Sequence, residues 1–392
     1  MRGRDELRTS SPNKMKKDRH TLKLYLRTFK EFSIIGDGPS TNTRDNTYWL
    51  TQIEEISDAE EVDVDETDPE ISELSKNIIM VENGYTATIN VPSMFHKFII
   101  GVQHSKKKLL EDEFRCNIEI PLFSSNSSVI SVTGSSKFNV LSACRRILWI
   151  VSDARIRCQP THFICLPVAC QVVKENFQKF RQSVLQAAKK SAAHDFVGVD
   201  SSVFHSTSTL HFTLVTLVLA DKYEIEKACD ALGTFCKSAK GYELFSRGPL
   251  SLTLRGLEYM NDDPDSVHVL YAKLTESPDA QRLQAIANEL LNVFTEKNLL
   301  HMTLLNSKYR QERDRQNVSS SHGFSPNARK PFSITGILKV AGDFCFAENQ
   351  SFDQLYLCDR LSFDSTTQFH KCCCKIEFNN TCDSECVRVV KV

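Results

Sequence analysis

The chain has 392 residues, which is enough for two or three domains with apolar cores of their own. Its 48 Lys and Arg residues almost balance its 49 Asp and Glu residues, so any affinity for nucleic acid must come from a local patch of positive charge. No apolar run reaches the length of a membrane span, and the first residues lack the apolar segment of a signal peptide. We therefore expect a cytosolic or nuclear protein with no membrane partner.

Most of the 14 cysteines are scattered, as expected for small buried side chains in a reducing compartment. One late group stands apart and contains Cys372, Cys373, Cys374, Cys382 and Cys386. Neighbouring residues of a strand point to opposite faces, so three consecutive thiols cannot all reach one metal ion, and the group contains no C-x-x-C pair. We expect neither a bound metal nor another cofactor.

Residues 1–78 differ in composition from the remainder of the chain. A basic beginning is followed by an acidic run over residues 53–73 with few aromatic residues, a composition typical of disordered segments. We interpret residues 1–78 as a disordered tail. It is either a solvated tether or a docking segment for a partner.

A small α+β module is predicted over residues 82–155. Residues 85–92 alternate as a strand that Pro92 ends, and a short apolar helix follows up to Gly101. The later elements of the module are a helix over 105–116, strands over 117–123 and 128–135, and an amphipathic helix over 137–155. The order is βααββα, with a tight glycine turn between the first two helices.

This order and the turn Gly-Val-Gln-His at residues 101–104 resemble the KH domain of the eukaryotic type. The resemblance implies binding of RNA or single-stranded nucleic acid. In that family a G-x-x-G loop lets the nucleic-acid backbone approach closely, because glycine has no Cβ, and nearby lysines face the phosphates.

Gly101 matches the first glycine of that loop, whereas His104 stands in place of the second. A histidine side chain crowds the position of the nucleic-acid backbone, although its ring can stack on a base or contact a phosphate. The predicted RNA-binding residues are Gly101, Val102, Gln103, His104, Lys106, Lys107 and Lys108. The alternative interpretation is a KH-shaped module that serves packing or protein contact.

A second α+β region is predicted over residues 160–392. Its elements are a strand over 161–168, a helix over 170–190, a strand over 210–219, a helix over 221–240, strands over 250–260 and 266–274, a helix over 279–294, and strands over 299–307, 333–342, 354–363 and 371–378. The polar stretch 312–330 is predicted to be a surface loop. Twice an amphipathic helix precedes a strand with an H-x-T motif, which indicates an internal repeat.

The two H-x-T strands carry the candidate catalytic residues. Residues i and i+2 of a strand share a face, so His211 lies beside Thr213 and His301 beside Thr303. If a pseudo-twofold axis relates the two halves, the four side chains meet over one cleft. One neutral imidazole then takes a proton from water or a ribose hydroxyl, and the other, protonated, gives one to the leaving oxygen. Threonine hydroxyls can donate hydrogen bonds to phosphate oxygens, which makes phosphodiesters the natural substrates.

A single H-x-T in an apolar strand is common by chance, and a lone histidine there is usually a satisfied core residue. Two copies, each preceded by an amphipathic helix, favour a paired site instead. Other histidines lack a partner at catalytic spacing and are predicted to be surface or packing residues; these are His194, His205, His268 and His322.

The extended motifs HFTLVTLVL and HMTLLNSKY resemble the two signature motifs of the 2H phosphoesterase superfamily, in the branch of the A-kinase-anchor nuclear-localisation-type domain. With the KH-like module, the resemblance covers about residues 80–392. It implies a bilobal α+β fold, with catalytic roles for His211 and His301 and phosphate contacts from Thr213 and Thr303. It also implies a nuclear subunit of a transcription cointegrator complex, which acts with a helicase and other subunits in transcription and alkylation-damage repair.

The predicted fold is therefore α+β, with a KH-like βααββα module followed by a bilobal, pseudo-twofold 2H phosphoesterase-like domain. One departure is the short connection from Phe294 to His301. Either the preceding helix ends early or His301 is displaced from the cleft, and a small displacement costs much activity. The functions left open are a metal-independent 2H-type phosphodiesterase on RNA ends or cyclic phosphates, a non-catalytic nucleic-acid-binding adaptor, and a purely structural subunit.

Overall fold

The computed structural model describes residues 74–122, 127–191, 194–294, 300–310, 329–378 and 387–391. Most of the predicted tail and of the predicted loop 312–330 lies outside these ranges, as do Cys382 and Cys386. Within the described part of the chain, no helix is both long enough and apolar enough to cross a membrane.

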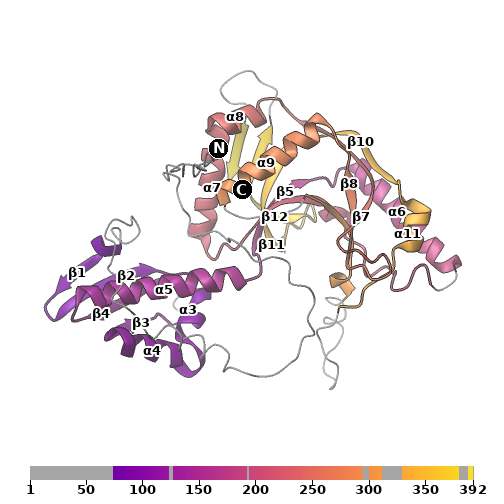
Figure 1. Ribbon diagram of the computed structural model, residues 1–392. Helices are drawn as coiled ribbons and strands as arrows, with labels where there is room; N and C mark the ends of the chain where they lie inside the picture. The colour runs from indigo at the N-terminus through magenta and orange to yellow at the C-terminus, as the bar shows by residue number, and fades with distance from the viewer. Residues whose placement is uncertain are drawn as a thin grey trace, which may run out of the picture.

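The first module is a four-stranded antiparallel sheet covered by helices (Figure 1). Its strands lie in the order β1 (Ile78–Val81), β2 (Gly84–Asn90), β4 (Val129–Gly134) and β3 (Cys116–Glu119). Its helices are α3 (Ser93–Ile100), α4 (Ser105–Phe114) and α5 (Lys137–Arg157), at the positions that the sequence predicts. Strand β1 has no counterpart in the sequence prediction and forms a hairpin with β2.

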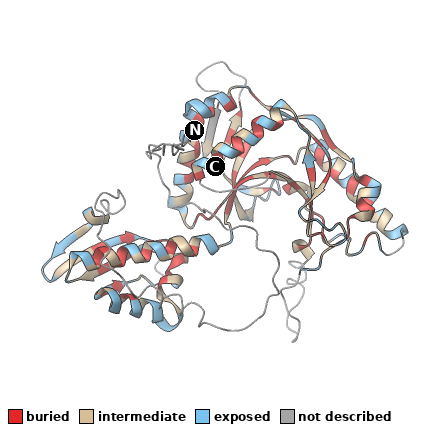
Figure 2. Ribbon diagram, viewed as in Figure 1, coloured by how far each residue is buried: buried red, intermediate tan, exposed pale blue. Residues whose placement is uncertain are grey.

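The core of this module follows from two periodicities. Ala87 and Ile89 of β2 are buried while Thr88 and Asn90 are exposed, as expected for a sheet with one covered face. Helix α5 buries residues spaced by three and four positions, which are Val140, Cys144, Ile147, Val151 and Ala154. In Figure 2 the buried parts of this module's helices and strands lie mainly where the helices and the sheet face each other.

The second domain is built on a nine-stranded antiparallel sheet. In spatial order its strands are β10 (Cys345–Phe352), β7 (Leu250–Tyr259), β8 (Val269–Leu274), β9 (Met302–Asn306), β6 (His211–Leu217), β5 (His162–Pro167), β11 (Gln354–Phe363), β12 (His370–Phe378) and β13 (Val387–Lys391). The two H-x-T strands, β6 and β9, are neighbours in the middle of the sheet. This agrees with the bilobal arrangement predicted from the repeat.

Helices cover one face of the sheet. They are α6 (Gln171–Lys190), α7 (Lys222–Lys237), α8 (Ala239–Phe245), α9 (Pro278–Phe294) and α11 (Thr335–Ala341). Helix α9 packs on β6 and β7, and α6 packs on β10 and α11. Their apolar sides join one core cluster with Phe212 of β6 and Met302 of β9. The residues on either side of Phe212 and Met302 therefore face away from the helices.

The predicted strand over 333–342 is wrong, because the structure forms α11 there. The β-branched residues of this stretch favour a strand. Its buried residues nevertheless follow a helical spacing, at Ile334, Ile337 and Ala341. Gly336 lets the helix approach Phe196 closely, since an added Cβ would lie 2.4 Å from that ring. Strands β10 and β13 also have no counterpart in the sequence prediction.

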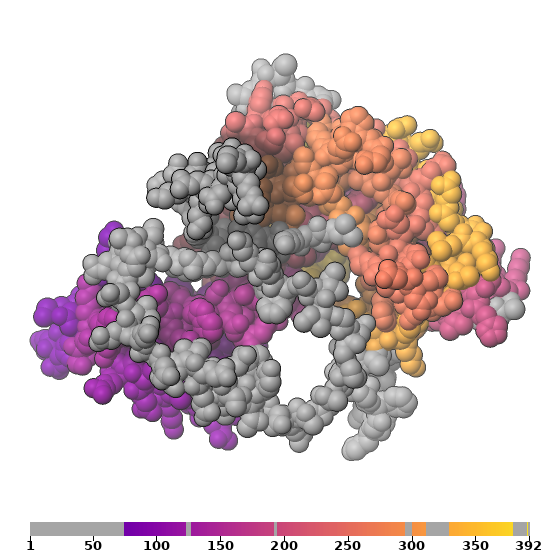
Figure 3. All heavy atoms as spheres, viewed as in Figure 1, coloured from indigo at the N-terminus to yellow at the C-terminus, as the bar shows by residue number. Residues whose placement is uncertain are grey.

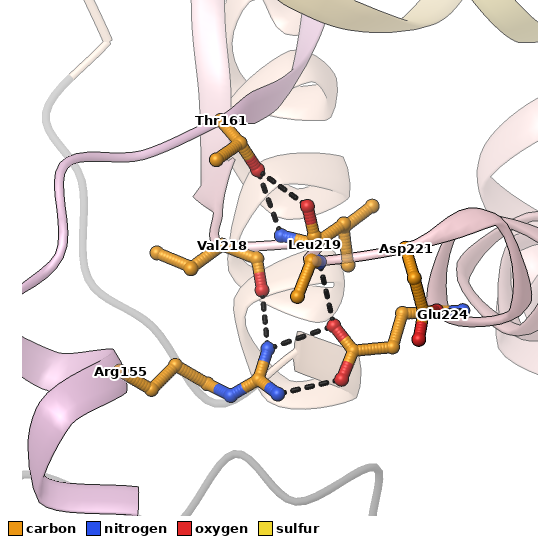
Figure 4. A network of polar contacts seen from close by, with 7 residues as sticks. Arg155, Thr161, Val218, Leu219, Asp221 and Glu224 are labelled. Carbon is orange, nitrogen blue, oxygen red and sulfur yellow. Dashed lines mark hydrogen bonds and ion pairs between the residues drawn. The ribbon is translucent and has the colours of Figure 1, made fainter. Parts of the chain in front are cut away.

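The two modules meet where α5 ends and where the chain leaves β6. In the space-filling view the indigo and purple atoms of the first module lie apart from the orange and yellow atoms of the second domain (Figure 3). Arg155 of α5 donates to the carbonyl oxygen of Val218, and its Nη2 lies 2.6 Å from Oε1 of Glu224 (Figure 4). Val218 itself is buried in the core of the first module.

Glu224, in the first turn of α7, also binds the segment that leads from β6 into that helix. Its carboxylate accepts a hydrogen bond from the backbone N–H of Ala220 at 2.7 Å. A cavity of about 400 Å³ remains between the modules, lined in part by Asn90, Ser152 and Tyr223. Because packing at the joint is incomplete, the Arg155–Glu224 pair is a principal direct link between the modules.

We expect Arg155→Ala to lower the free energy of unfolding by about 3 kcal/mol, because it leaves the Glu224 carboxylate without its partner in a nearly buried site. The two side chains are 10% and 15% exposed. The matched control is Lys222→Ala, which breaks an ion pair with Glu226 whose side chains are 90% and 53% exposed, and which should cost less than about 1 kcal/mol. Urea denaturation of the full chain measures both losses. Equal losses would contradict the role given to Arg155.

Candidate functional site

One backbone pairing sets the geometry of the site. Strands β6 and β9 are antiparallel, with Phe212 opposite Met302. Residues one step away in opposite directions are then also opposite, so the histidine of each H-x-T motif lies across from the threonine of the other. Phe212 and Met302 are fully buried under the helices, so the motif side chains share the other face. These partly exposed residues are His211, Thr213, His301 and Thr303.

The same register shows whether the short connection from Phe294 displaces His301 from the cleft. His301 directly precedes Met302, whose position opposite Phe212 is given by the strand pairing. His301 is therefore not displaced from the face that carries the first motif. Residues 295–299 lie outside the described ranges.

Strand β8 forms the wall on the His301 side. Tyr271 lies opposite Thr303, and its ring centroid is 5.4 Å from that of His301 in an edge-to-face arrangement. The Tyr271 hydroxyl donates to Oε2 of Glu258 at 3.1 Å, and Glu258 pairs with Lys273 at 2.8 Å. This chain of contacts holds the tyrosine ring against the second motif.

Strands β5 and β12 form an aromatic wall on the His211 side. The Phe163 ring stacks on His211 with centroids 4.9 Å apart and planes at 25°. His370 approaches His211 edge-on at 5.9 Å, and Phe369 does so at 6.1 Å. Phe163 and Phe369 are buried in a small cluster with Cys165 and with Cys358, separate from the main core. One side of His211 is therefore apolar.

A network of hydrogen bonds to the Thr209 carbonyl fixes the orientation of the His211 ring. Its Nδ1 donates to the carbonyl oxygen of Thr209 at 2.6 Å. Nε2 of His205 donates to the same carbonyl at 3.1 Å, and the Tyr309 hydroxyl donates to Nδ1 of His205 at 2.6 Å. Because a carbonyl only accepts, His211 carries its proton on Nδ1 when neutral. Its Nε2 lone pair is then available as a proton acceptor.

Both imidazoles of this network are neutral at pH 7. The pKa of His211 is lowered to about 3, first by burial and then by the charges of His205, His370 and His301, while the hydrogen bond to Thr209 acts to raise it. Burial likewise lowers the pKa of His205 to about 4. The influence of His301 on the pKa of His211 means that the two motif histidines interact electrostatically.

His205 is one residue of the candidate site that sequence reasoning missed. The prediction that it lacks a partner is wrong, since its ring centroid lies 6.1 Å from that of His211. Its backbone N–H donates to the carbonyl of Leu304 at 2.8 Å, so the segment before β6 is bound to the end of β9. The cluster of Ser and Thr residues after His205 signalled a turn, which was the only local hint that the chain folds back.

The KH-like loop has the left-handed backbone conformation that glycine favours, although His104 occupies the position of the second glycine. Gly101 has φ of 69°, and an added Cβ would lie 2.9 Å from the Lys106 side chain. Gln103 and His104 have φ of 50° and 63°, the left-handed region that side chains disfavour. The loop thus keeps a sharply turned conformation, and His104 stands exposed at its end.

The predicted lysines of this loop differ in their surroundings. Lys107 pairs with Glu111 at 3.1 Å on the same helix. Lys106 and Lys108 are exposed, as is Val102 at the tip of the loop. The structure therefore presents an exposed loop with two cationic side chains beside it, which suits phosphate contact.

Two family models match the chain. The AKAP7 2'5' RNA ligase-like domain matches residues 160–378, and the KH domain matches residues 86–148. A curated mouse protein (Mus musculus), "Activating signal cointegrator 1 complex subunit 1", is 30% identical over 308 residues, which cover 75% of this chain and 84% of that protein.

Two more distant likenesses accompany these matches. Human vigilin is 36% identical over 74 residues, which cover 19% of this chain and 6% of that protein. The crystal structure of TT0787 of Thermus thermophilus aligns with 52% of this chain and 89% of that chain, at 13% identity and a TM-score of 0.28. Neither likeness extends over the whole chain.

Acid should destabilise the fold through His205 and His211. In an unfolded chain a histidine has a pKa of about 6.5, so its side chain takes up a proton below this pH. In the folded chain the pKa is about 4 for His205 and about 3 for His211, so between about pH 6.5 and pH 4 the unfolded state binds more protons than the folded state. At pH 5 each histidine should lower the free energy of unfolding by roughly 2 kcal/mol relative to pH 7. Denaturant melts at both pH values measure this loss.

His205→Gln is the informative variant, because glutamine can still donate to the Thr209 carbonyl but does not titrate. In this variant the free energy of unfolding should fall by roughly 2 kcal/mol less between pH 7 and pH 5 than in the wild type, because one titrating histidine is removed. The exposed His194→Gln is the matched control and should leave the loss unchanged. Identical pH dependence in both variants would show that His205 is not a buried neutral imidazole.

Proposed function

This chain belongs to the family of the AKAP7 2'5' RNA ligase-like domain, with a KH domain ahead of it, and on that premise we propose that its H-x-T face is a metal-independent phosphodiesterase site for RNA ends or cyclic phosphates. The observation that carries this proposal is the register of Phe212 opposite Met302, which sets two imidazoles and two threonine hydroxyls on one face. One phosphate group can accept hydrogen bonds from the two threonine hydroxyls and from a protonated His301, while the Nε2 lone pair of neutral His211 accepts the proton of the attacking oxygen.

His211 suits the part of general base. Its Nδ1–H is held by the Thr209 carbonyl, so Nε2 takes a proton from water or from a ribose 2′-hydroxyl. The oxygen thus activated attacks phosphorus as the bond from phosphorus to the leaving oxygen breaks. His301, protonated, gives its proton to that oxygen. Thr213 and Thr303 donate to the non-bridging oxygens, where negative charge increases in the transition state.

The KH domain supplies single-stranded RNA in this proposal. Its exposed loop ends at His104 and lies beside the exposed Lys106 and Lys108. Phosphate contacts of this kind make affinity fall as salt concentration rises. Because α5 is tied to the chain beyond β6 through Arg155 and Glu224, RNA held by the KH domain stays at a set orientation to the H-x-T face.

The name of the mouse relative gives the biological setting of the proposal. That protein is named as a subunit of the activating signal cointegrator 1 complex. We propose that this chain is likewise a subunit of such a cointegrator complex. We further propose, from the family resemblance of its motifs, that it is a nuclear protein acting with a helicase and other subunits in transcription and alkylation-damage repair.

A second candidate function is a nucleic-acid-binding adaptor that retains the fold without turnover. The packing of Phe163 on His211 favours it, because such burial lowers the pKa of His211 to about 3, whereas a general base works best with a pKa near the operating pH. A bound anionic phosphate favours the charged imidazole and raises this pKa. Catalysis therefore requires that the substrate itself restore the basicity of His211.

Hydrolysis of oligonucleotides with 2′,3′-cyclic or 3′-modified ends, in the presence of a chelator, tests the two candidates. If the site turns over, His211→Ala and His301→Ala should each lower kcat by about a hundredfold or more. His194→Ala changes an exposed histidine and should leave kcat unaltered. Unchanged hydrolysis in a variant lacking both motif histidines would remove them from the mechanism, and no hydrolysis by the wild type would favour the adaptor.

A further inference from the structure

We propose that the end of the β11–β12 hairpin is a nucleobase-stacking subsite, in which a base of the substrate lies on the exposed face of the Phe363 ring. The inference rests on the proposed phosphodiester chemistry and names its substrate class more closely. The ligand is a nucleoside phosphate whose base is unpaired, as at a single-stranded RNA end.

A series of rings leads from the H-x-T face to this hairpin. His211 contacts His370 at 5.9 Å, and His370 contacts Phe363 at 4.7 Å with planes only 31° apart. Phe163 packs edge-on against His370 at 4.9 Å and stacks on His211. Phe363 is thus two ring contacts away from His211, the candidate general base.

Exposure distinguishes Phe363 from the other aromatic rings of the series. Phe163 and Phe369 are 5% and 7% exposed, whereas Phe363 is 57% exposed. Leu361, two residues earlier on the same strand, is 76% exposed. Scattered apolar residues are common on surfaces, but Phe363 also packs on His370 and so continues the aromatic wall of the candidate site.

The hairpin end is held rigid by its own hydrogen bonds. Phe363 pairs with His370 in the strand register. The carboxylate of Asp364 accepts hydrogen bonds from the backbone N–H groups of Thr366 and Thr367 at 2.9 and 2.7 Å, and its own N–H donates to the carbonyl of Phe369 at 2.9 Å. The Phe363 ring is therefore a preformed platform, and it loses little conformational entropy when a ligand binds.

The chemistry of the platform selects the kind of ligand. An aromatic ring with one open face stacks on any base, because every base has a π face, and this contact carries little sequence preference. A base inside a duplex has both faces covered by its neighbours. A single-stranded end, with its phosphate between the motif histidines and its base on Phe363, satisfies both parts of the site.

The test uses full-length protein and 2-aminopurine riboside 3′-monophosphate, a fluorescent probe that stacking quenches and that has no phosphodiester bond to cleave. Phe363→Ala should weaken binding of the probe by about fivefold to a hundredfold and abolish the quenching. Phe363→Trp should retain both. Phe363→Leu, which keeps apolar surface but no ring, should lose the quenching.

Phe138→Ala is the matched control, because Phe138 of the KH domain is 56% exposed and lies on α5, outside the aromatic wall. It should bind the probe as the wild type does. Inorganic phosphate should compete with the probe equally well in the wild type and in Phe363→Ala, since it has no base.

Unchanged affinity and quenching in Phe363→Ala would overturn the subsite, and so would a wild-type protein that does not bind the probe. The proposed phosphodiesterase fails separately, in the hydrolysis assay. Quenching that depends on Phe363 in a protein without hydrolytic activity would support the base subsite and contradict the phosphodiesterase.

Discussion

The pairing of Phe212 with Met302 is the constraint on which the rest of the second domain depends. Side chains of a strand alternate between faces, so this one pairing decides the face of every residue in both H-x-T motifs. A slip of one residue in either strand would push that strand's imidazole and hydroxyl into the apolar core and expose Phe212 or Met302. The apolar sides of α6 and α9 therefore protect the arrangement of the polar groups on the opposite face.

The same central strand also connects the two modules. Strand β6 begins at His211, and the chain beyond its end contributes Val218 to the core of the KH domain. Arg155 and Glu224 stabilise this crossing with a bidentate ion pair. Strand β6, which begins with His211, is thus held at both ends. Before it, the segment at His205 is hydrogen-bonded to β9, and after it, Val218 packs in the core of the KH domain.

The sequence predicted those parts of the structure that depend on local periodicity. Helix α3, helix α5 and the two H-x-T strands have patterns of three, four or two residues that few other structures satisfy. The strand predicted over 333–342 fails because β-branched residues suit both a strand and a short packed helix, and only contact with Phe196 decides between them.

The surroundings of the motif residues could not be read in the same way. His205 reaches His211 only because its backbone binds the end of β9, about a hundred residues later in the chain, and because Tyr309 bonds its ring. Phe163, His370 and Phe363 gather around His211 through strand pairings whose registers contain bulges. The motif was visible in the sequence, whereas the network and the aromatic wall around it arise from tertiary contacts.

The most direct test of the central claim is whether one anion engages both motif histidines at once. Nuclear magnetic resonance of the imidazole nitrogens, followed during titration with inorganic phosphate, measures this for each ring. If one phosphate lies between both rings, the signals of His211 and His301 should shift with the same midpoint, and the pKa of His211 should rise in the complex. Different midpoints for the two rings, or a shift of only one, would contradict a shared phosphate site.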